Sequence, residues 1–350
     1  MIQDLIQTTA RSSAARSSAA RSSATAFKVR ETCAALGGSC SGFYAHRHKA
    51  QRQRRREDRI LGAEMEKLFD DSAFDGGADS QERGTYGSPR LVRALRKEGF
   101  RTSKTRVSRL MKSRGLQPGQ KRRVRVRTTC SDPHRPVAPH LLLNAPPAYR
   151  PGERFQSDIT YIPTDQGTLY LAATIDAYSR KCLGWSAADN MESPLVVRAA
   201  WGTLTNVDPN DTNDSVENHV KTPIHHSDRG SQYASEMFRD FLRSNGITQS
   251  MSRKANCYDN ALMESFWATL KTECFDNFRN RIPATHPEAK QKIFRYIEVF
   301  YNRKRLHSSL DYCSPCEFEE NYRLQNQRQN QLQSQSQNLK KETNLTFLLS

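Results

Sequence analysis

Residues 154–187 read RFQSDITYIPTDQGTLYLAATIDAYSRKCLGWSA, and this run sets the architecture that we predict for the chain. The segments 154–162, 168–175 and 181–187 are rich in β-branched, aromatic and aliphatic side chains, which favours strands. The short link 176–179 leaves room only for a tight turn between the second and third segments. The sequence therefore predicts three consecutive strands joined by hairpins.

Beyond these strands the pattern changes to helices separated by one short strand. We expect helices at 193–205, at 235–244, from about 260 and from 287 to about 301, a strand at 223–226 and a loop at 246–258. Three hairpin-linked strands followed by alternating helices and strands fit a mixed sheet flanked by helices. We therefore assign residues 153–320 to one α/β domain that ends in a helix.

The chain of 350 residues is polar and strongly basic. Hydrophobic residues make up 36%, and the mean hydropathy is −0.79, so part of the chain is expected to be linker or tail. Lys and Arg (54) exceed Asp and Glu (37) by 17, which suits a polyanionic partner. Nucleic acid is favoured over an anionic membrane surface because the positive charge is spread over many segments. No run approaches the roughly 18 apolar residues of a membrane-spanning helix, so the sequence excludes a protein with helices that span a membrane.

Composition also marks the two ends of the chain and a linker. Residues 10–24 repeat Ala-Arg-Ser-Ser-Ala three times, and we interpret 1–26 as a disordered leader or as sequence upstream of the structural start, rather than as a transit peptide. A dense basic run at 121–127, followed by five prolines, identifies 117–152 as a basic, Pro-rich linker. The Gln/Asn-rich residues 321–350 are expected to be disordered because they cannot bury enough apolar surface.

Two helical segments, 27–74 and 75–116, lie between the leader and the linker. The first combines a short helix, a glycine pair and a second helix start, which fits a helix–turn–helix or a plain helical hairpin. In the second, helix 88–97 ends at Gly99, and Ser103 opens another helix. Basic side chains surround that helix, which suits docking in the major groove, although a solvated charged face would show the same pattern. They are Arg101, Lys104, Arg106 and Arg109.

Three acidic residues stand out by their positions. Asp158 lies inside the first strand, where a carboxylate is costly to bury unless it binds a cation or is well hydrogen-bonded. Asp228 follows the strand 223–226, and sites gather at strand ends in α/β sheets. Glu264 lies on the helix from about 260, about 60° from Trp267, at the margin of the apolar stripe. Three convergent carboxylates predict hard divalent cations, above all Mg²⁺, and a pair of such ions can act at a phosphorus centre.

The spacing of these acids is weak support by itself, since 37 of 350 residues are acidic. Asp259 is a rival third carboxylate, but it precedes Asn260 at the start of the helix and fits an N-cap better. Lys271, one heptad after Glu264, is well placed for a phosphate contact.

The eight cysteines are scattered along a chain with no secretory signal, which is typical of cytosolic thiols. Cys313 and Cys316 form the only close pair. A zinc site would need a second pair or histidines at ligand spacing, and His307 is the only histidine nearby. We therefore expect no metal at this pair.

The carboxylate pattern and its neighbours resemble a known group of enzymes. Asp158, Asp228 and Glu264, with 35 residues between the last two, resemble the D,D(35)E pattern of retroviral-type integrases and DDE transposases. The surrounding sequence over about residues 30–320 is similar to the OrfB-type transposases of the IS3 family of bacterial insertion sequences. The matching stretches are Tyr86-Gly-Ser, Asp158-Ile-Thr-Tyr161, Ile175-Asp176 with Ser179-Arg180-Lys181, His226-Ser-Asp-Arg-Gly-Ser-Gln-Tyr233, Asn256-Cys-Tyr-Asp-Asn-Ala261, Glu264-Ser-Phe with Leu270-Lys271, and Tyr301-Asn-Arg with His307.

The resemblance implies an RNase H-like integrase core, Mg²⁺-dependent DNA cleavage and strand transfer by water or a 3′-hydroxyl, and N-terminal helices that bind the element's ends. Two Mg²⁺ ions, replaceable by Mn²⁺, would be held by the three acids, which are then both catalytic and metal-binding. Arg229, Lys254 and Lys271 would contact phosphates, while Asn256 and Asn260 would shape the loop beside the site.

The partners implied are double-stranded DNA (terminal inverted repeats and target), a second copy of the chain in a synaptic complex, and an OrfA-type protein from an upstream frame. No membrane partner is expected, and the implied location is the bacterial cytoplasm at the nucleoid. The leader repeat and the Gln-rich tail match nothing in the family pattern, and a long leucine-zipper segment is missing.

Two other functions stay open at this stage. A DNA-binding regulator on an inactive core would need no intact carboxylates, yet all three are present. A metal-dependent nuclease would cut DNA without joining it, and a strand-transfer assay with a pre-cleaved end separates it from a transposase.

Overall fold

The computed structural model describes residues 29–74, 84–118, 137–206, 222–253, 257–275 and 282–348. The chain forms two compact units, Met1–Met65 and Glu66–Ser350. Both the leader repeat and the basic run that the sequence analysis singled out lie outside the described residues. Within the described part of the chain, no helix is both long enough and apolar enough to cross a membrane.

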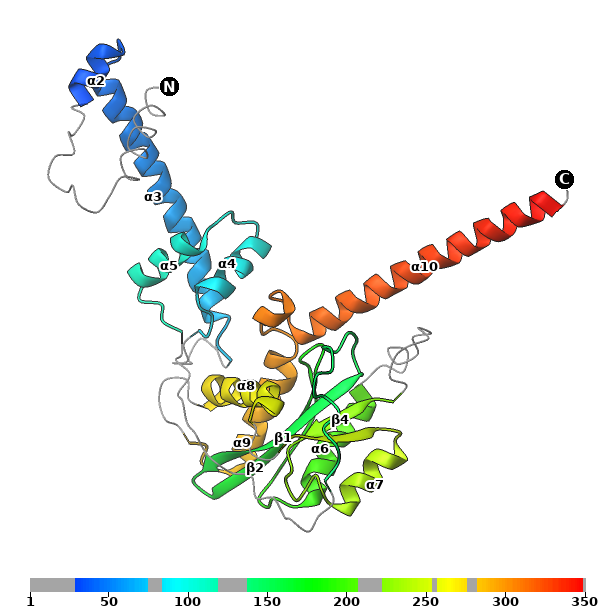
Figure 1. The fold of residues 1–350 in the computed structure, drawn as a ribbon. Coiled ribbons are helices and arrows are strands. Elements are labelled where there is room, and N and C mark those ends of the chain that lie inside the picture. Colours follow the sequence, from blue (N-terminus) through cyan, green and yellow to red (C-terminus); the bar gives the residue numbers. More distant parts are fainter. Residues whose placement is uncertain are drawn as a thin grey trace. The chain divides into compact units, whose positions relative to one another are not determined.

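The first unit contains α2 (Val29–Ala35) and most of α3 (Cys40–Asp70), the blue ribbon of Figure 1. Gly37 follows α2 with a φ of +63°, a left-handed conformation that glycine adopts without strain. The predicted glycine stop is therefore present. Beyond it, α3 continues unbroken through the arginine-rich stretch.

The HTH-like segment consists of α4 (Ser88–Lys97) and α5 (Lys104–Ser113), as the sequence predicts. Ser103 caps α5, since its side chain accepts a hydrogen bond from the Arg106 backbone N–H. Apolar side chains on the facing sides of the two helices are buried, and they include Leu91, Leu95 and Val107. The two helices thus share a small core and leave the basic side of α5 facing outward.

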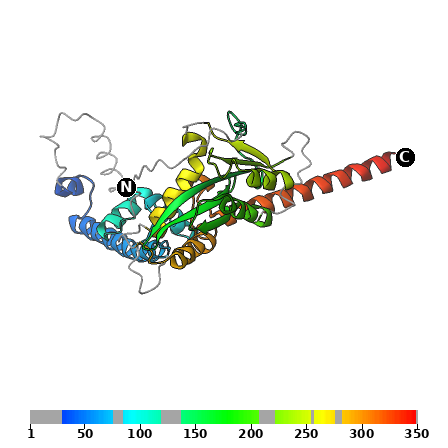
Figure 2. The ribbon, with the colours of Figure 1, turned by 90° about the horizontal axis from the view of Figure 1, so that it is seen from below.

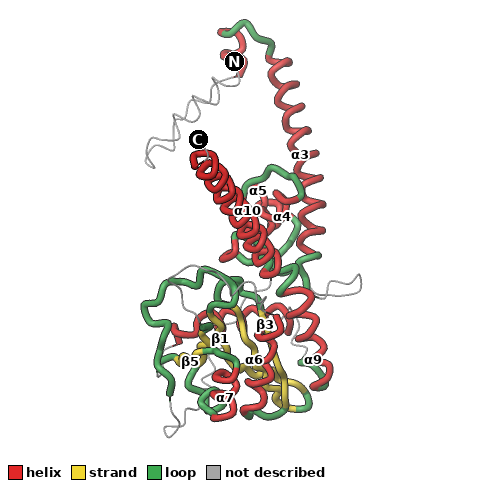
Figure 3. Tube along the Cα trace, turned by 90° about the vertical axis from the view of Figure 1, so that its right-hand side faces the viewer, coloured by secondary structure: helices red, strands yellow, loops and turns green. Residues whose placement is uncertain are grey.

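One five-stranded sheet forms the centre of the second unit (Figures 1 and 3). Its strands are β1 (Arg154–Thr164), β2 (Gly167–Asp176), β3 (Cys182–Ala188), β4 (Ile224–Ser227) and β5 (Thr248–Met251), in the order β3-β2-β1-β4-β5. The hairpin-linked strands β1, β2 and β3 are antiparallel, and β4 and β5 join them in parallel. This is the predicted mixed sheet, and β1 lies at its centre.

Helices cover both faces of the sheet (Figure 1). One face carries α6 (Ser193–Asn206) and α7 (Glu236–Ser244), and the other carries α8 (Ala261–Leu270), α9 (His286–Phe294) and the π-helical turns η3 (Lys271–Phe275) and η4 (Arg295–Tyr301). Side chains of β2 point alternately into the two cores. Leu169, Leu171 and Ala173 pack against the core beneath α8, while Ala172 packs against the core beneath α6.

Strand β5 differs from the prediction, which placed a loop at 246–258. Its sequence, Thr-Gln-Ser-Met, offers no apolar alternation, because Met251 is its only apolar residue and the buried Ser250 beside it is polar. Backbone pairing with β4, from Ile224↔Thr248 to Ser227↔Met251, defines this strand.

The C-terminal residues also differ from the expectation of disorder for 321–350. Pro315–Leu348 form one continuous helix, α10, the long red ribbon of Figure 2. Gln, Glu, Lys, Arg and Leu are good helix formers, and no glycine or proline follows Pro315 in this helix. The low apolar content of residues 321–350 predicted disorder, whereas the helix propensity of the same residues favours a helix.

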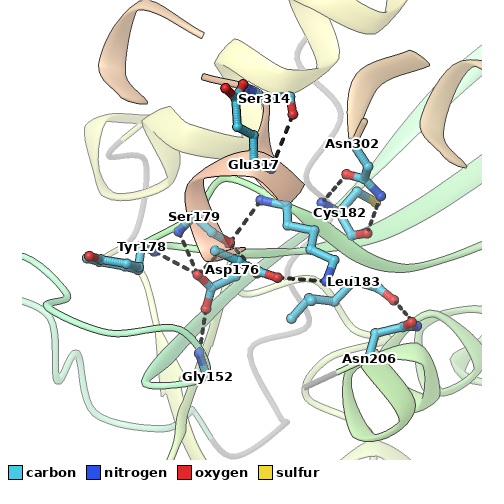
Figure 4. A network of polar contacts seen from close by, with 12 residues as sticks. Gly152, Asp176, Tyr178, Ser179, Cys182, Leu183, Asn206, Asn302, Ser314 and Glu317 are labelled. Carbon is cyan, nitrogen blue, oxygen red and sulfur yellow. Dashed lines mark hydrogen bonds and ion pairs between the residues drawn. The ribbon is translucent and has the colours of Figure 1, made fainter. Parts of the chain in front are cut away.

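The first turns of α10 attach to the β2–β3 turn through a buried polar network (Figure 4). Asp176 accepts hydrogen bonds from the backbone N–H groups of Gly152, at 2.9 Å, and Ser179, at 2.7 Å. Glu319 of α10 accepts one from the Ser179 hydroxyl and pairs with Lys181, both at 2.7 Å. The Ile175-Asp176 and Ser179-Arg180-Lys181 stretches therefore build a structural corner of the domain.

Candidate active site

Asp158 lies in the middle of the central strand β1, opposite Ala173 of β2. Its half-buried carboxylate accepts a hydrogen bond from the Trp267 indole, with 3.0 Å between Nε1 and Oδ2. Burial, followed by the negative charge of Asp228, raises the pKa of Asp158 to about 7. Asp158 is thus held in a position where ionisation is costly unless a cation compensates its charge.

Asp228 directly follows strand β4, which runs parallel to β1. The register pairs Gln156 with His226, so two further residues along each strand bring Asp228 alongside Asp158 on the same face. The Asp228 Oδ1 accepts the Gly230 backbone N–H at 2.9 Å. A Cβ on Gly230 would lie 2.9 Å from that oxygen, so a larger residue would force the carboxylate to shift.

Glu264 lies in the first turn of α8, on its exposed side. Its neighbours Met263 and Trp267 are buried against the sheet, so Glu264 borders the packed face, as its helical position predicts. Its charge contributes less than that of Asp228 to the raised pKa of Asp158. The structure therefore brings Asp158 and Asp228 side by side, and Glu264 lies near enough for its charge to act on Asp158.

The donor set fits a hard divalent cation. Carboxylate oxygens are the preferred ligands of Mg²⁺, and burial together with the Asp228 charge makes the ionised form of Asp158 unfavourable, a cost that a cation would offset. The fully buried Tyr233 adds an orphaned polar atom, since its hydroxyl has no hydrogen-bond partner among the described residues. Burial, then the charges of Asp158 and Asp228, raise the pKa of that phenol. However, no three His, Cys, Asp or Glu side chains of the described residues are already close enough to hold a metal.

Asp259 is not the helix cap that the sequence predicts. The N-cap of α8 is Asn260, whose side chain makes no capping bond. The Asp259 carboxylate instead pairs with Arg253, at 3.1 Å, and with His140, at 3.2 Å. The hydrogen bond from the Arg253 side chain is the main cause that lowers the pKa of Asp259 to about 2. The prediction was wrong because neither partner is a near neighbour: Arg253 precedes Asp259 by six residues, and His140 is far away in the sequence.

The predicted site-shaping and phosphate-contacting residues are only partly described. Asn260 is buried, and its Nδ2 lies 3.5 Å from the Ser157 carbonyl oxygen, next to Asp158. Lys254 and Asn256 lie outside the described residues. The Arg229 Nε donates to the Ser252 carbonyl oxygen at 2.7 Å.

The remaining predicted DNA contacts lie directly after α8 and in or just before α5. Lys271 follows the last residue of α8. Around α5, three of the four basic residues are exposed and one is half-buried; the exposed ones are Arg101, Lys104 and Arg109, and the half-buried one is Arg106.

Sequence reasoning missed the groups that support the carboxylates. Trp267 was assigned only to the apolar stripe, although its place one turn after Glu264 could have suggested a contact with β1. The pair of Glu273 and Arg305 gave no signal, because 32 residues separate them. His307, weighed for zinc, faces Arg305 at 3.3 Å and the Tyr301 ring.

Comparisons with known proteins agree with this geometry. Residues 148–257 and 245–315 each match an "Integrase core domain", and residues 55–124 match an "HTH-like domain". The "Insertion element IS600 uncharacterized 31 kDa protein" of Shigella sonnei is 37% identical over 83% of this chain and 98% of its own length. "Transposase InsF for insertion sequence IS3A" of Escherichia coli K12 is 32% identical over 84% of this chain and 94% of its own length.

Among solved structures, the HTLV-2 integrase catalytic core domain in complex with magnesium is similar to 49% of this chain and 99% of that chain, with 14% identity and a TM-score of 0.36. The HTH-like and integrase domains imply that the protein binds DNA. With relatives at this level over most of its length, the chain belongs to the IS3 family of insertion-sequence transposases, which are enzymes of the DDE transposase and integrase type.

Proposed function

We propose that this transposase binds the ends of its element and catalyses divalent-metal-dependent DNA cleavage and strand transfer at Asp158, Asp228 and Glu264. The observation that carries the proposal is the alignment of Asp158 and Asp228 on neighbouring parallel strands, with Glu264 on the helix packed beside them. Two Mg²⁺ ions, for which Mn²⁺ can substitute, would activate the attacking oxygen and stabilise the leaving oxygen.

The protein's own groups would prepare this site in three ways. The three carboxylates would hold the ions, and Trp267 would fix the orientation of Asp158 through its indole N–H. Asn260, with Asn256, would shape the wall beside Asp158. Arg229, Lys254 and Lys271 would contact DNA phosphates near the site, where basic side chains position the strand.

The outward-facing basic side of α5 would supply contacts to the terminal repeats. These contacts would come from Arg101, Lys104, Arg106 and Arg109. The full assembly would contain two element ends, target DNA and more than one copy of the chain, with an OrfA-type protein as a further partner. We place this reaction in the bacterial cytoplasm at the nucleoid, where the DNA substrate lies.

The test is strand transfer by Asp158→Asn, Asp228→Asn and Glu264→Gln on one labelled element end. Each amide keeps the side-chain shape but loses the charge that holds the ions, so each variant should lose cleavage and joining. End binding should persist, because it depends on Arg and Lys elsewhere. The matched control is Asp240→Asn, an exposed carboxylate on α7 that pairs with Arg243 of the same helix.

Two outcomes would count against the proposal. If the three triad variants join DNA as well as the control, the carboxylates are not the metal site and a DNA-binding regulator becomes the better account. If the wild-type protein cuts an element end but never joins a pre-cleaved one, the protein is a nuclease.

A further inference from the structure

We propose that Asp259 is a positioning residue: with His140 and Arg253 it forms a clamp that fixes the start of α8, and thereby Glu264, against the sheet. We call this group of three side chains the Asp259 clamp. The proposal deepens the proposed function and rests on it, because it concerns how the third carboxylate reaches its place.

The Asp259 carboxylate has partners on two sides: it accepts hydrogen bonds from Arg253 and lies within ion-pair distance of His140. From one side, Arg253 donates its backbone N–H at 2.9 Å and its guanidinium at 3.1 and 3.2 Å. From the other side, the His140 Nε2 lies 3.2 Å from Oδ2. Only 7% of the Asp259 side chain and 11% of the His140 side chain are exposed, so this contact is shielded from water, whereas the half-exposed Arg253 makes the other contact at the surface.

His140 belongs to the linker, and the linker is attached to the edge of the sheet. The Leu141 backbone N–H donates to the Ser250 hydroxyl at 2.9 Å, and the Met251 N–H donates to the Pro139 carbonyl at 3.3 Å. Ser250 and Met251 both belong to strand β5. The segment 139–141 therefore covers the edge strand and holds His140 beside Asp259.

The clamp acts at the point where α8 begins. Asp259 lies in the short 3-10 turn Cys257–Asn260, which leads directly into the helix. Asn260 makes no capping bond but contacts the Ser157 carbonyl oxygen, and Asp259 adds the hydrogen bonds from Arg253 at this helix start. Glu264 follows within the first turn of α8, on its exposed side, so the position of its carboxylate depends on where the helix starts.

This arrangement makes the linker part of the catalytic domain's site. The linker connects the HTH-like segment to the core. Its residues Pro139 and Leu141 bond to β5, and His140 contacts the turn that precedes α8. A change at His140 should therefore alter the position of Glu264, although within the described part of the chain His140 makes no hydrogen bond or ion pair with α4, α5 or the three carboxylates.

The test compares Asp259→Ala, Arg253→Ala and His140→Ala with the control Asp240→Ala in the full-length protein. Mn²⁺ binding is measured by electron paramagnetic resonance, and strand transfer is measured as a function of Mn²⁺ concentration. Loss of partners that orient metal ligands typically weakens metal binding about 10–100-fold. We expect Asp259→Ala to raise the Mn²⁺ concentration for half-maximal binding and for half-maximal strand transfer by roughly tenfold, with the maximal rate restored at saturating Mn²⁺.

Arg253→Ala and His140→Ala should shift both curves in the same direction by less, because each leaves other donors on Asp259. Arg253 is half exposed, so its variant tests the clamp even if Asp259→Ala folds poorly. Asp259→Glu should restore part of the affinity.

Curves for all three clamp variants that coincide with the Asp240→Ala curve would overturn the proposal. So would an Asp259→Ala protein that stays inactive at saturating Mn²⁺, since Asp259 would then be a ligand or catalytic group. Either result leaves the proposed function standing if wild-type strand transfer still requires Mn²⁺ and Glu264. Wild-type activity without a divalent ion would instead remove the proposed function itself.

Discussion

The buried pair of Glu273 and Arg305 offers a sharp test of what holds the catalytic domain together. Arg305 donates to both carboxylate oxygens of Glu273, with Nε–Oε2 at 2.7 Å and Nη2–Oε1 at 2.8 Å, and Tyr296 donates its hydroxyl at 2.8 Å. Only 4% of the Arg305 side chain and 7% of the Glu273 side chain are exposed. Arg305→Met keeps the volume approximately but leaves the Glu273 charge buried without its cation.

Breaking a buried pair by removing one partner costs about 3–5 kcal/mol, because the remaining charge is uncompensated. For a domain of this size, that cost lowers the melting temperature by roughly 6–20 °C. The assay is denaturant unfolding followed by tryptophan fluorescence, since the three tryptophans (Trp185, Trp201 and Trp267) all lie in the catalytic domain. The double variant Glu273→Leu with Arg305→Met should recover most of the loss, because no charge remains unpaired.

The pH dependence of this variant has a definite sign. Burial raises the pKa of Glu273, but the Arg305 charge outweighs it and lowers the pKa below its usual value. A depressed carboxylate pKa contributes stability above the unfolded-state pKa and loses it as the pH falls through the folded-state pKa. The gap between wild type and Arg305→Met should therefore be widest near neutral pH and narrow in acid. A gap under about 1 kcal/mol at pH 7.5, or equal destabilisation by single and double variants, would refute this reasoning.

Three further predictions concern the carboxylates and the thiols. Trp267→Phe removes the hydrogen-bond donor to Asp158 and should raise the Mn²⁺ concentration for half-maximal binding roughly tenfold in a titration followed by electron paramagnetic resonance. An unchanged binding curve would show that the indole serves only to pack α8 against the sheet. Because burial and Asp228 raise the pKa of Asp158 to about 7, the folded protein loses stability as the pH rises from the unfolded-state pKa of about 4 to the folded-state pKa of about 7. Asp158→Asn should thus raise the melting temperature of the metal-free protein more at pH 8 than at pH 4, and equal shifts at the two pH values would contradict this. Changing Cys313 and Cys316 to Ser should leave melting and strand transfer near wild type, and stoichiometric zinc lost in that variant would show the opposite.

The sequence was informative where burial imposes a period. Side chains of β2 alternate between the two cores, so their pattern in the sequence predicts the strand and the packing of helices on both of its faces. The apolar face of α8 likewise identified the margin where Glu264 lies. Strand β5 could not be found this way, because it is an edge strand held by backbone pairing with β4.

Long-range polar contacts were also beyond the sequence. Asp259 precedes a helix and resembles a cap, and only the fold brings His140, from the linker, to its carboxylate. Nothing local distinguishes Glu273 from the other acids before Arg305 is placed beside it. Helix α10 shows that low apolar content is a poor guide to disorder, since a composition that cannot build a core can still favour a helical backbone.

The central claim is that Asp158, Asp228 and Glu264 together hold the catalytic ions. The most direct measurement is anomalous diffraction from crystals of the protein bound to an element end and soaked with Mn²⁺. We predict Mn²⁺ peaks bounded by the three carboxylates, lost or displaced in Glu264→Gln. Peaks at other residues, or a Glu264→Gln protein that keeps both its peaks and its strand transfer, would contradict the account.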